Sequence, residues 1–123
     1  MKTLLAAALA LTVLAPTAAA RADSPACDVS VQFGSYAMGI DGRAFEKVQR
    51  YIARHPRLIL TSSVMSWGRE GEKTVCLTAA NGRAGATIVF RDIKALVGKG
   101  RRGPVEVRTL DGRVWRSHPG TGR

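Results

Sequence analysis

Two short segments of this chain, each of which carries a cysteine, alternate apolar and polar residues, and a segment of helical period lies between them. Residues 27–33 and 74–79 place apolar side chains at every second position, which predicts two half-buried strands. Apolar residues recur at helical spacing over 44–52, so we expect a helix there. Asp41 is a suitable N-cap for this helix, and Pro56 ends it.

The remaining segments extend this order to strand, helix, two strands, helix and strand. Residues 58–67 are rich in β-branched and apolar residues, and residues 105–110 and 113–116 flank an Asp-Gly turn signal, so we expect strands there. This order is typical of the ferredoxin-like βαββαβ fold, in which two helices cover one face of an antiparallel sheet. The alternative is one long helix with a β-meander.

Residues 83–90 fit two different structures. The Asn-Gly pair at 81–82 and the β-branched residues after it favour a hairpin whose second strand ends near residue 90. Apolar positions over 86–97 fit one face of a helix that ends at Gly98. We prefer the helix, because the second half of this segment is helical in either interpretation.

The first 22 residues are a predicted secretory signal peptide. They combine Lys2, an apolar run over residues 4–15 and an Ala-Arg-Ala sequence at 20–22, which indicates cleavage before Asp23. The run has 12 residues, whereas a helix needs about 20 to cross a bilayer. The sequence before Cys27 lacks the leucine of a lipoprotein signal. We therefore expect an exported protein, secreted or periplasmic, without a membrane anchor or a lipid.

Cleavage leaves 101 of the 123 residues, enough for a single α+β domain over 23–117 with a flexible tail over 118–123. Cys27 and Cys76 are the two cysteines and lie 49 positions apart. In an oxidising compartment we expect them to form a disulfide, which stabilises by about 4 kcal/mol if it acts through loop entropy. The two cysteines fall on opposite sides of their alternating patterns. Cys27 therefore lies just before its strand, or a bulge shifts the pattern.

The chain is basic, with a formal net charge of +10. Loss of the signal peptide lowers this net charge to +8, of which +6 lies in residues 94–123. Lys47, Arg50 and Arg54 fall on the solvent side of the first predicted helix. A basic surface can bind nucleic acid, anionic lipid or an acidic protein. The excess of 14 Arg over 5 Lys is also what GC-rich coding produces without selection for binding. We do not expect nucleic acid to be the partner.

A glycine-containing loop over residues 34–42 is the first candidate site. Its three glycines match neither a dinucleotide-binding loop nor a phosphate-binding loop. We therefore expect a connector in which the glycines supply unusual backbone angles. The alternative is a small ligand site whose polar groups are Ser35, Tyr36 and Arg43.

Two further segments are candidate partner surfaces. Trp67 and Arg69 lie at a predicted hairpin tip, and residues of these two types often dominate binding interfaces. Lys99, Arg101 and Arg102 lie in a basic loop between the second helix and the last strands. The alternative is that Trp67 packs on the sheet and that the charged residues are simply solvated.

Few residues of the chain suit catalysis. The two histidines, His55 and His118, are far apart in the sequence, and bridged cysteines offer no thiol nucleophile. We expect no enzymatic activity, no cofactor and no metal. The sequence favours a small binding or accessory protein that contacts a periplasmic protein or an anionic envelope component through its basic C-terminal third. The alternatives are a secreted peptidase inhibitor or intramolecular chaperone and, third, a small hydrolase.

Overall fold

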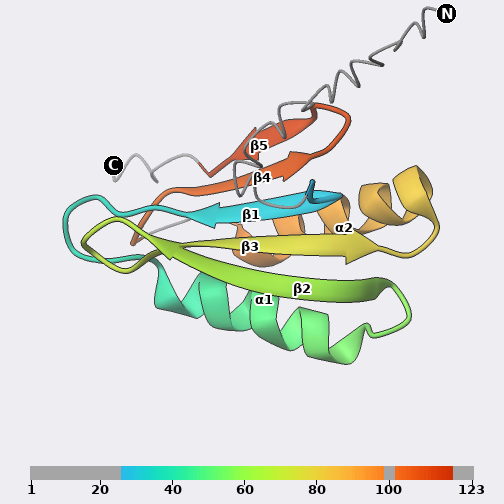
Figure 1. Cartoon of the computed structure of the whole chain (residues 1–123). Helices are drawn as coiled ribbons and strands as arrows, with labels where there is room; N and C mark the ends of the chain where they lie inside the picture. The colour runs from blue at the N-terminus through green and yellow to red at the C-terminus, as the bar shows by residue number, and fades with distance from the viewer. Residues whose placement is uncertain (1–25, 99–101, 118–123) are drawn as a thin grey trace, which may run out of the picture.

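The computed structural model describes residues 26–98 and 102–117 (Figure 1). The predicted signal peptide and the predicted tail over 118–123 lie outside the described residues. The elements, in chain order, are β1 (Val29–Phe33), α1 (Gly42–Arg54), β2 (Ile59–Trp67), β3 (Glu72–Ala79), α2 (Gly82–Val97), β4 (Val105–Thr109) and β5 (Val114–Arg116). The described chain is therefore a small α+β domain with two helices and five strands.

The five strands form one sheet in the order β2-β3-β1-β4-β5, and every neighbouring pair is antiparallel. The first strand lies beside the third. The βαββαβ pattern has four strands, and β5, which lies within the strand predicted over 113–116, extends the sheet beyond β4 by one strand. As a result β2 and β5 form the two edges of the sheet.

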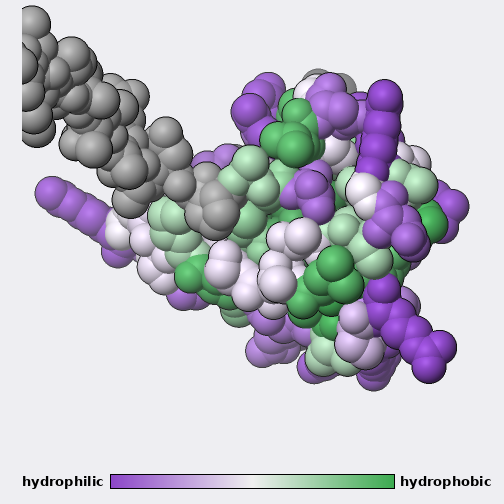
Figure 2. All heavy atoms as spheres, turned by 45° about the vertical axis from the view of Figure 1, so that its right-hand side comes forward, coloured by the Kyte–Doolittle hydropathy of each residue, from purple (hydrophilic) through white to green (hydrophobic). Residues whose placement is uncertain are grey.

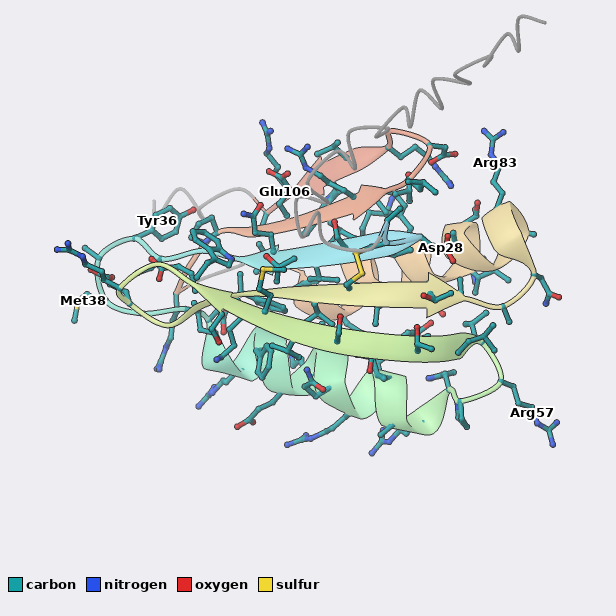
Figure 3. The ribbon with its side chains drawn as sticks, in the orientation of Figure 1. Asp28, Tyr36, Met38, Arg57, Arg83 and Glu106 are labelled. Atoms are coloured by element: carbon teal, nitrogen blue, oxygen red, sulfur yellow. A yellow bond between two sulfur atoms is a disulfide. The ribbon has the colours of Figure 1, made fainter. Side chains whose placement is uncertain are left out.

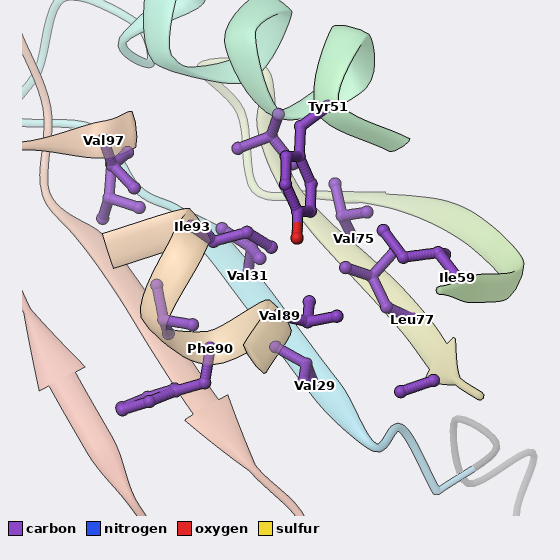
Figure 4. Close-up of a cluster of buried hydrophobic side chains, with 14 of the residues drawn as sticks. Val29, Val31, Tyr51, Ile59, Val75, Leu77, Val89, Phe90, Ile93 and Val97 are labelled. Carbon is purple, nitrogen blue, oxygen red and sulfur yellow. The ribbon is translucent and has the colours of Figure 1, made fainter. Parts of the chain in front are cut away.

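One face of the sheet and the inner sides of both helices form a single hydrophobic core. Alternate residues of β1, β3 and β4 are buried there, while their neighbours face the other side of the sheet. Figure 4 shows Tyr51 of α1 pointing into this cluster, towards side chains of β1, β3 and α2. Both helices therefore cover the same face, because their buried residues belong to the same core.

The first helix begins and ends where the sequence predicted. The Asp41 side chain accepts a hydrogen bond from the Ala44 backbone N–H at 3.1 Å, which satisfies one of the free donors of the first turn. At the other end the His55 backbone N–H donates to the Ile52 carbonyl, and Pro56 is the next residue. Asp41 is buried, and its carboxylate is used in the helix cap.

Residues 83–90 are helical, so the alternative of a second hairpin strand is wrong. Asn81 and Gly82 have φ angles of +61° and +55°, which is the backbone that the Asn-Gly turn signal favours. The chain nevertheless enters α2 after this turn, because Ala86, Val89 and Ile93 then bury one helical face in the core. The local turn was correctly predicted, and packing against the core selects a helix after it.

The disulfide between Cys27 and Cys76 is present, with a Cα–Cα distance of 5.2 Å. Strand β1 begins at Val29, so Cys27 lies before the strand, and the pairing of β1 with β3 has no bulge. Of the two explanations offered for the opposed cysteine positions, the first is confirmed. A hydrogen bond from the Ala79 backbone N–H to the Asp28 carboxylate adds a second link between the start of β1 and β3.

Candidate functional site

The glycine-containing loop and the β2–β3 hairpin tip lie together at one end of the sheet. The Ser35 hydroxyl donates to Glu70 Oε2 at 2.5 Å and accepts from the backbone N–H groups of Ala37 and Gly39 at 3.0 Å each. Gly39 has a φ angle of +90°, an angle that glycine adopts at little cost. The polar atoms of Ser35 are thus used to hold the loop in place, and Arg43 lies beyond it in the first turn of α1.

Apolar side chains project from this end. Met38 is 95% exposed and Tyr36 is half exposed, and Figure 3 shows both at the end of the sheet opposite Arg57 and Arg83. Trp67 is partly exposed, and its indole N–H donates to Thr74 Oγ1 at 3.0 Å. The face in Figure 2 likewise exposes hydrophobic side chains between long hydrophilic ones.

The C-terminal hairpin neutralises most of its own positive charge. Arg108 and Arg116 both form ion pairs with Glu106, with Arg116 Nε 2.7 Å from Glu106 Oε2. Burial by itself raises the pKa of Glu106, but hydrogen bonds from the two guanidinium groups outweigh it and hold the pKa below its usual value. The hairpin therefore presents less free charge than its sequence suggests. Lys99 and Arg101 of the predicted basic surface lie outside the described residues.

A second internal charge cluster is centred on Asp111. Its carboxylate accepts hydrogen bonds from Thr109 and Arg113 and lies 3.1 Å from Arg83 Nε. The bonds from Thr109 and Arg113 lower the pKa of Asp111 to about 2. These residues line a hollow of about 210 Å³ beside the start of α2. Each of its arginines already has a carboxylate partner, so this hollow offers no unpaired cation to a ligand.

Free cations gather instead on α1. Arg43, Lys47, Arg50 and Arg54 follow one another at spacings of four, three and four residues, which places them on one stripe of the helix. Side chains that end in nitrogen extend from α1 on the side away from the sheet (Figure 3). Arg50 lies 3.8 Å from Glu46, and both side chains are mostly exposed. An exposed pair of this kind contributes little, so the stripe keeps most of its charge.

This stripe borders a groove between the two helices. Two adjoining hollows of about 570 and 450 Å³ share Lys47, Ala95 and Leu96 as lining residues. The first also contains Arg43 and Arg102, and the second contains Arg50 and Arg54. We call this feature the α1–α2 groove. The residues that α2 contributes to its lining are apolar, and most of those that α1 contributes are basic.

Four cations of the α1–α2 groove have no carboxylate partner within the described residues. These are Arg43, Lys47, Arg54 and Arg102, whereas every arginine of the C-terminal hairpin is paired. Asp41 is the carboxylate among the lining residues of the two hollows, and it is engaged in the α1 cap. An anionic ligand would therefore meet a positive surface whose charges are available.

The sequence placed Lys47, Arg50 and Arg54 on the solvent side of the helix, but the groove was missed. Arg43 was assigned to the loop and Arg102 to a separate basic surface, and α2 brings both to one feature. The spacing of the basic residues along α1 was the available signal. This spacing does not show that α2 lies beside α1, which makes the basic stripe one side of a groove.

The groove holds few groups of catalytic type. The His55 ring stacks on Tyr51 and its Nδ1 lies 2.7 Å from the Tyr51 carbonyl oxygen. Burial and a hydrogen bond to Asp92 raise the pKa of Tyr51, so its hydroxyl stays protonated at neutral pH. Within residues 26–98 and 102–117, no group of three or more His, Cys, Asp or Glu could hold a metal ion.

Comparisons with protein-family models, with curated proteins and with solved structures find no match to this chain. In the same described segments, no helix is long and apolar enough to cross a membrane.

Proposed function

We propose that this chain is a small exported binding protein without enzymatic activity that recognises an anionic partner in the α1–α2 groove. The observation that carries the proposal is the set of unpaired cations that line two adjoining hollows between the helices. This relocates the binding surface from the C-terminal third, which the sequence favoured, to the helical face. We also propose that β1 to β4 and the two helices form a ferredoxin-like βαββαβ unit, with β5 as an addition.

The shape of the groove favours a narrow anionic partner, such as an acidic segment of a protein. The stripe from Arg43 to Arg54 extends for about 16 Å at the α-helical rise of 1.5 Å per residue. The lining combines these cations with Ala95 and Leu96 of α2, of which Leu96 is partly buried. An extended chain of about five residues would fit this length and could contact both the cations and the apolar residues of α2.

The test measures binding of a fluorescein-labelled oligoglutamate peptide to the mature chain by anisotropy. We expect Lys47→Ser/Arg54→Ser to weaken binding about 5- to 30-fold, because each exposed cation contributes roughly 0.5 to 1 kcal/mol. Arg57→Ser/Arg69→Ser is the matched control, since it removes the same charge from side chains that lie outside the groove and have no carboxylate partner within the described residues. Binding should also weaken steeply between 0.1 M and 1 M salt, as the screening length falls from about 10 Å to about 3 Å.

Two results would contradict the groove. If the two double variants weaken peptide binding equally, binding depends on the net charge of the chain and not on the groove. The second result is that the chain binds phosphatidylglycerol vesicles more tightly than the peptide, with no effect of Lys47→Ser/Arg54→Ser. That result would show that the chain binds lipid through a surface outside the groove. Export is checked separately by intact mass, which should show a chain that begins at Asp23 with no lipid and no free thiol.

A further inference from the structure

The outer edge of β2 is long, exposed and free of charge. Eight of its nine residues are exposed, and Ile59 alone is buried. Its exposed apolar residues include Val64 and Met65, which are 47% and 48% exposed. The strand ends the sheet, so its outer backbone groups have no strand partner within the described residues.

Soluble proteins usually protect such an edge with charges, prolines, bulges or very short strands. The opposite edge follows this rule, because β5 has only three residues and ends in Arg116. Strand β2 contains neither a charged residue nor a proline, and its single irregularity lies at its start, between Ile59 and Thr61. The two edges of one sheet thus differ, and β2 has the features of a strand that pairs with another chain.

Helix α1 keeps its charges away from this edge. The basic stripe of α1 lines the α1–α2 groove, whereas Phe45 and Ile52 are partly buried against the core. Lys73 contacts both the Phe45 ring and the Ser66 hydroxyl of β2, so α1 lies close to this strand. The side of the molecule formed by β2 therefore differs from the basic groove in its chemistry.

We propose that β2 pairs with β2 of a second copy of this chain, so that two five-stranded sheets join into one sheet of ten strands. An antiparallel pair of identical strands is self-complementary about a twofold axis, and the same residues serve on both sides. Ser63 is the middle residue of β2, and the axis would pass near it. A strand without charges pairs with its own copy without like-charge repulsion, even though each chain is basic.

The size of the edge fits a reversible dimer. Nine residues of strand span about 30 Å, and a sheet covered by one helix layer is roughly 20 Å thick, so each copy would bury about 600 Å². Stable interfaces bury about 800 Å² on each partner. We therefore expect a dissociation constant in the micromolar range and a mixture of monomer and dimer at ordinary concentrations.

The first test is sedimentation equilibrium of the mature chain between about 1 and 500 μM. We expect Val64→Lys to weaken the dimer at least tenfold, because the twofold axis brings two new charges into one interface. Val114→Lys is the control, since Val114 is 46% exposed and lies on the opposite edge. Both positions are exposed, and circular dichroism of each variant checks that it folds. Met65→Lys repeats the test with a side chain on the other face of β2.

The second test is oxidative cross-linking of single-cysteine variants built on Cys27→Ser/Cys76→Ser, because Ser63 lies opposite Cys76 in the β2–β3 pairing and a third cysteine could exchange with the native disulfide. Directly opposed residues of an antiparallel pair have Cα atoms about 4.5–5.5 Å apart, a separation that a disulfide can bridge. Ser63→Cys should give a covalent dimer at low micromolar concentration, and Val114→Cys should not. Salt should strengthen this dimer, because it screens the repulsion between two basic chains, whereas it should weaken binding in the groove. A chain that stays monomeric at 500 μM in 0.5 M salt, or equal effects of Val64→Lys and Val114→Lys, would overturn the proposal.

Discussion

Removal of the disulfide should cost this domain a large part of its stability while leaving its fold intact. The variant is Cys27→Ser/Cys76→Ser, which replaces both sulfur atoms by smaller hydroxyls. Without the bridge, the 49-residue separation is no longer closed in the unfolded chain. The loop-entropy relation then gives a loss of about 4 kcal/mol at 25 °C. Domains of this size are commonly stable by about 5–15 kcal/mol, so the variant should still fold.

The structure explains why the fold should persist. The start of β1 is also held by the hydrogen bond from the Ala79 N–H to the Asp28 carboxylate and by that from the Leu110 N–H to the Asp28 carbonyl. The loss should therefore appear in the unfolding equilibrium and leave the circular dichroism spectrum unchanged. We expect a melting temperature lower by roughly 15–30 °C, at 4–8 °C for each kcal/mol in a domain of this length.

The assay is urea unfolding of the two proteins, followed by circular dichroism. The m-value should rise in the variant, because an unfolded chain without the cross-link exposes more surface. Treatment of the native protein with a reductant should reproduce the variant curve. A loss below about 1 kcal/mol with an unchanged m-value would refute the reasoning, because the cross-link would then not restrict the unfolded chain.

Two further predictions concern single residues. Gly85→Ala should destabilise the domain by roughly 1–3 kcal/mol in urea, since an added Cβ would collide with the Ala80 carbonyl oxygen, whereas Gly42→Ala has open space around it and should have little effect. The lowered pKa of Asp111 contributes stability that is present above pH about 4 and is lost as the pH falls towards 2, so Asp111→Asn should be less stable at neutral pH and should flatten the acid side of the stability profile. A profile of Asp111→Asn that retains the full acid slope would contradict this account, as would equal losses for the two glycine variants.

Local sequence signals predicted the elements well, and long-range packing accounts for most of what they did not predict. Residues 58–67 were expected to form a strand from their composition, and β2 covers nearly this range. That β2 would form a sheet edge with almost every residue exposed does not follow from composition. Whether a strand lies at an edge depends on which strands pair with it. Composition predicts that β2 and β3 are strands, but it does not say which of them lies at the edge.

The candidate site shows the same division between local and long-range information. Helical periodicity identified the solvent side of α1 from its own residues. The groove needs α2 beside it and Arg102 at its end, which are set by packing of segments some 50 residues apart. The final hairpin was expected to be strongly basic, yet Glu106 takes up two of its arginines because the β4–β5 register places Arg116 opposite it. Residue counts cannot reveal such compensation.

The groove and the β2 edge together suggest how a weak binder could become a strong one. In an antiparallel pairing through β2, the twofold axis is perpendicular to the sheet, so both helix layers lie on the same face of the ten-stranded sheet. Both basic grooves would then face one side, related by the axis. A partner with two acidic segments could bind both grooves at once, and its apparent affinity would exceed that for a single groove without any new contact. The Val64→Lys variant separates these effects, because it should retain affinity for a single oligoglutamate segment and lose the additional affinity for a tandem one. Equal affinity of the variant and the native chain for the tandem peptide would show that the two surfaces act independently.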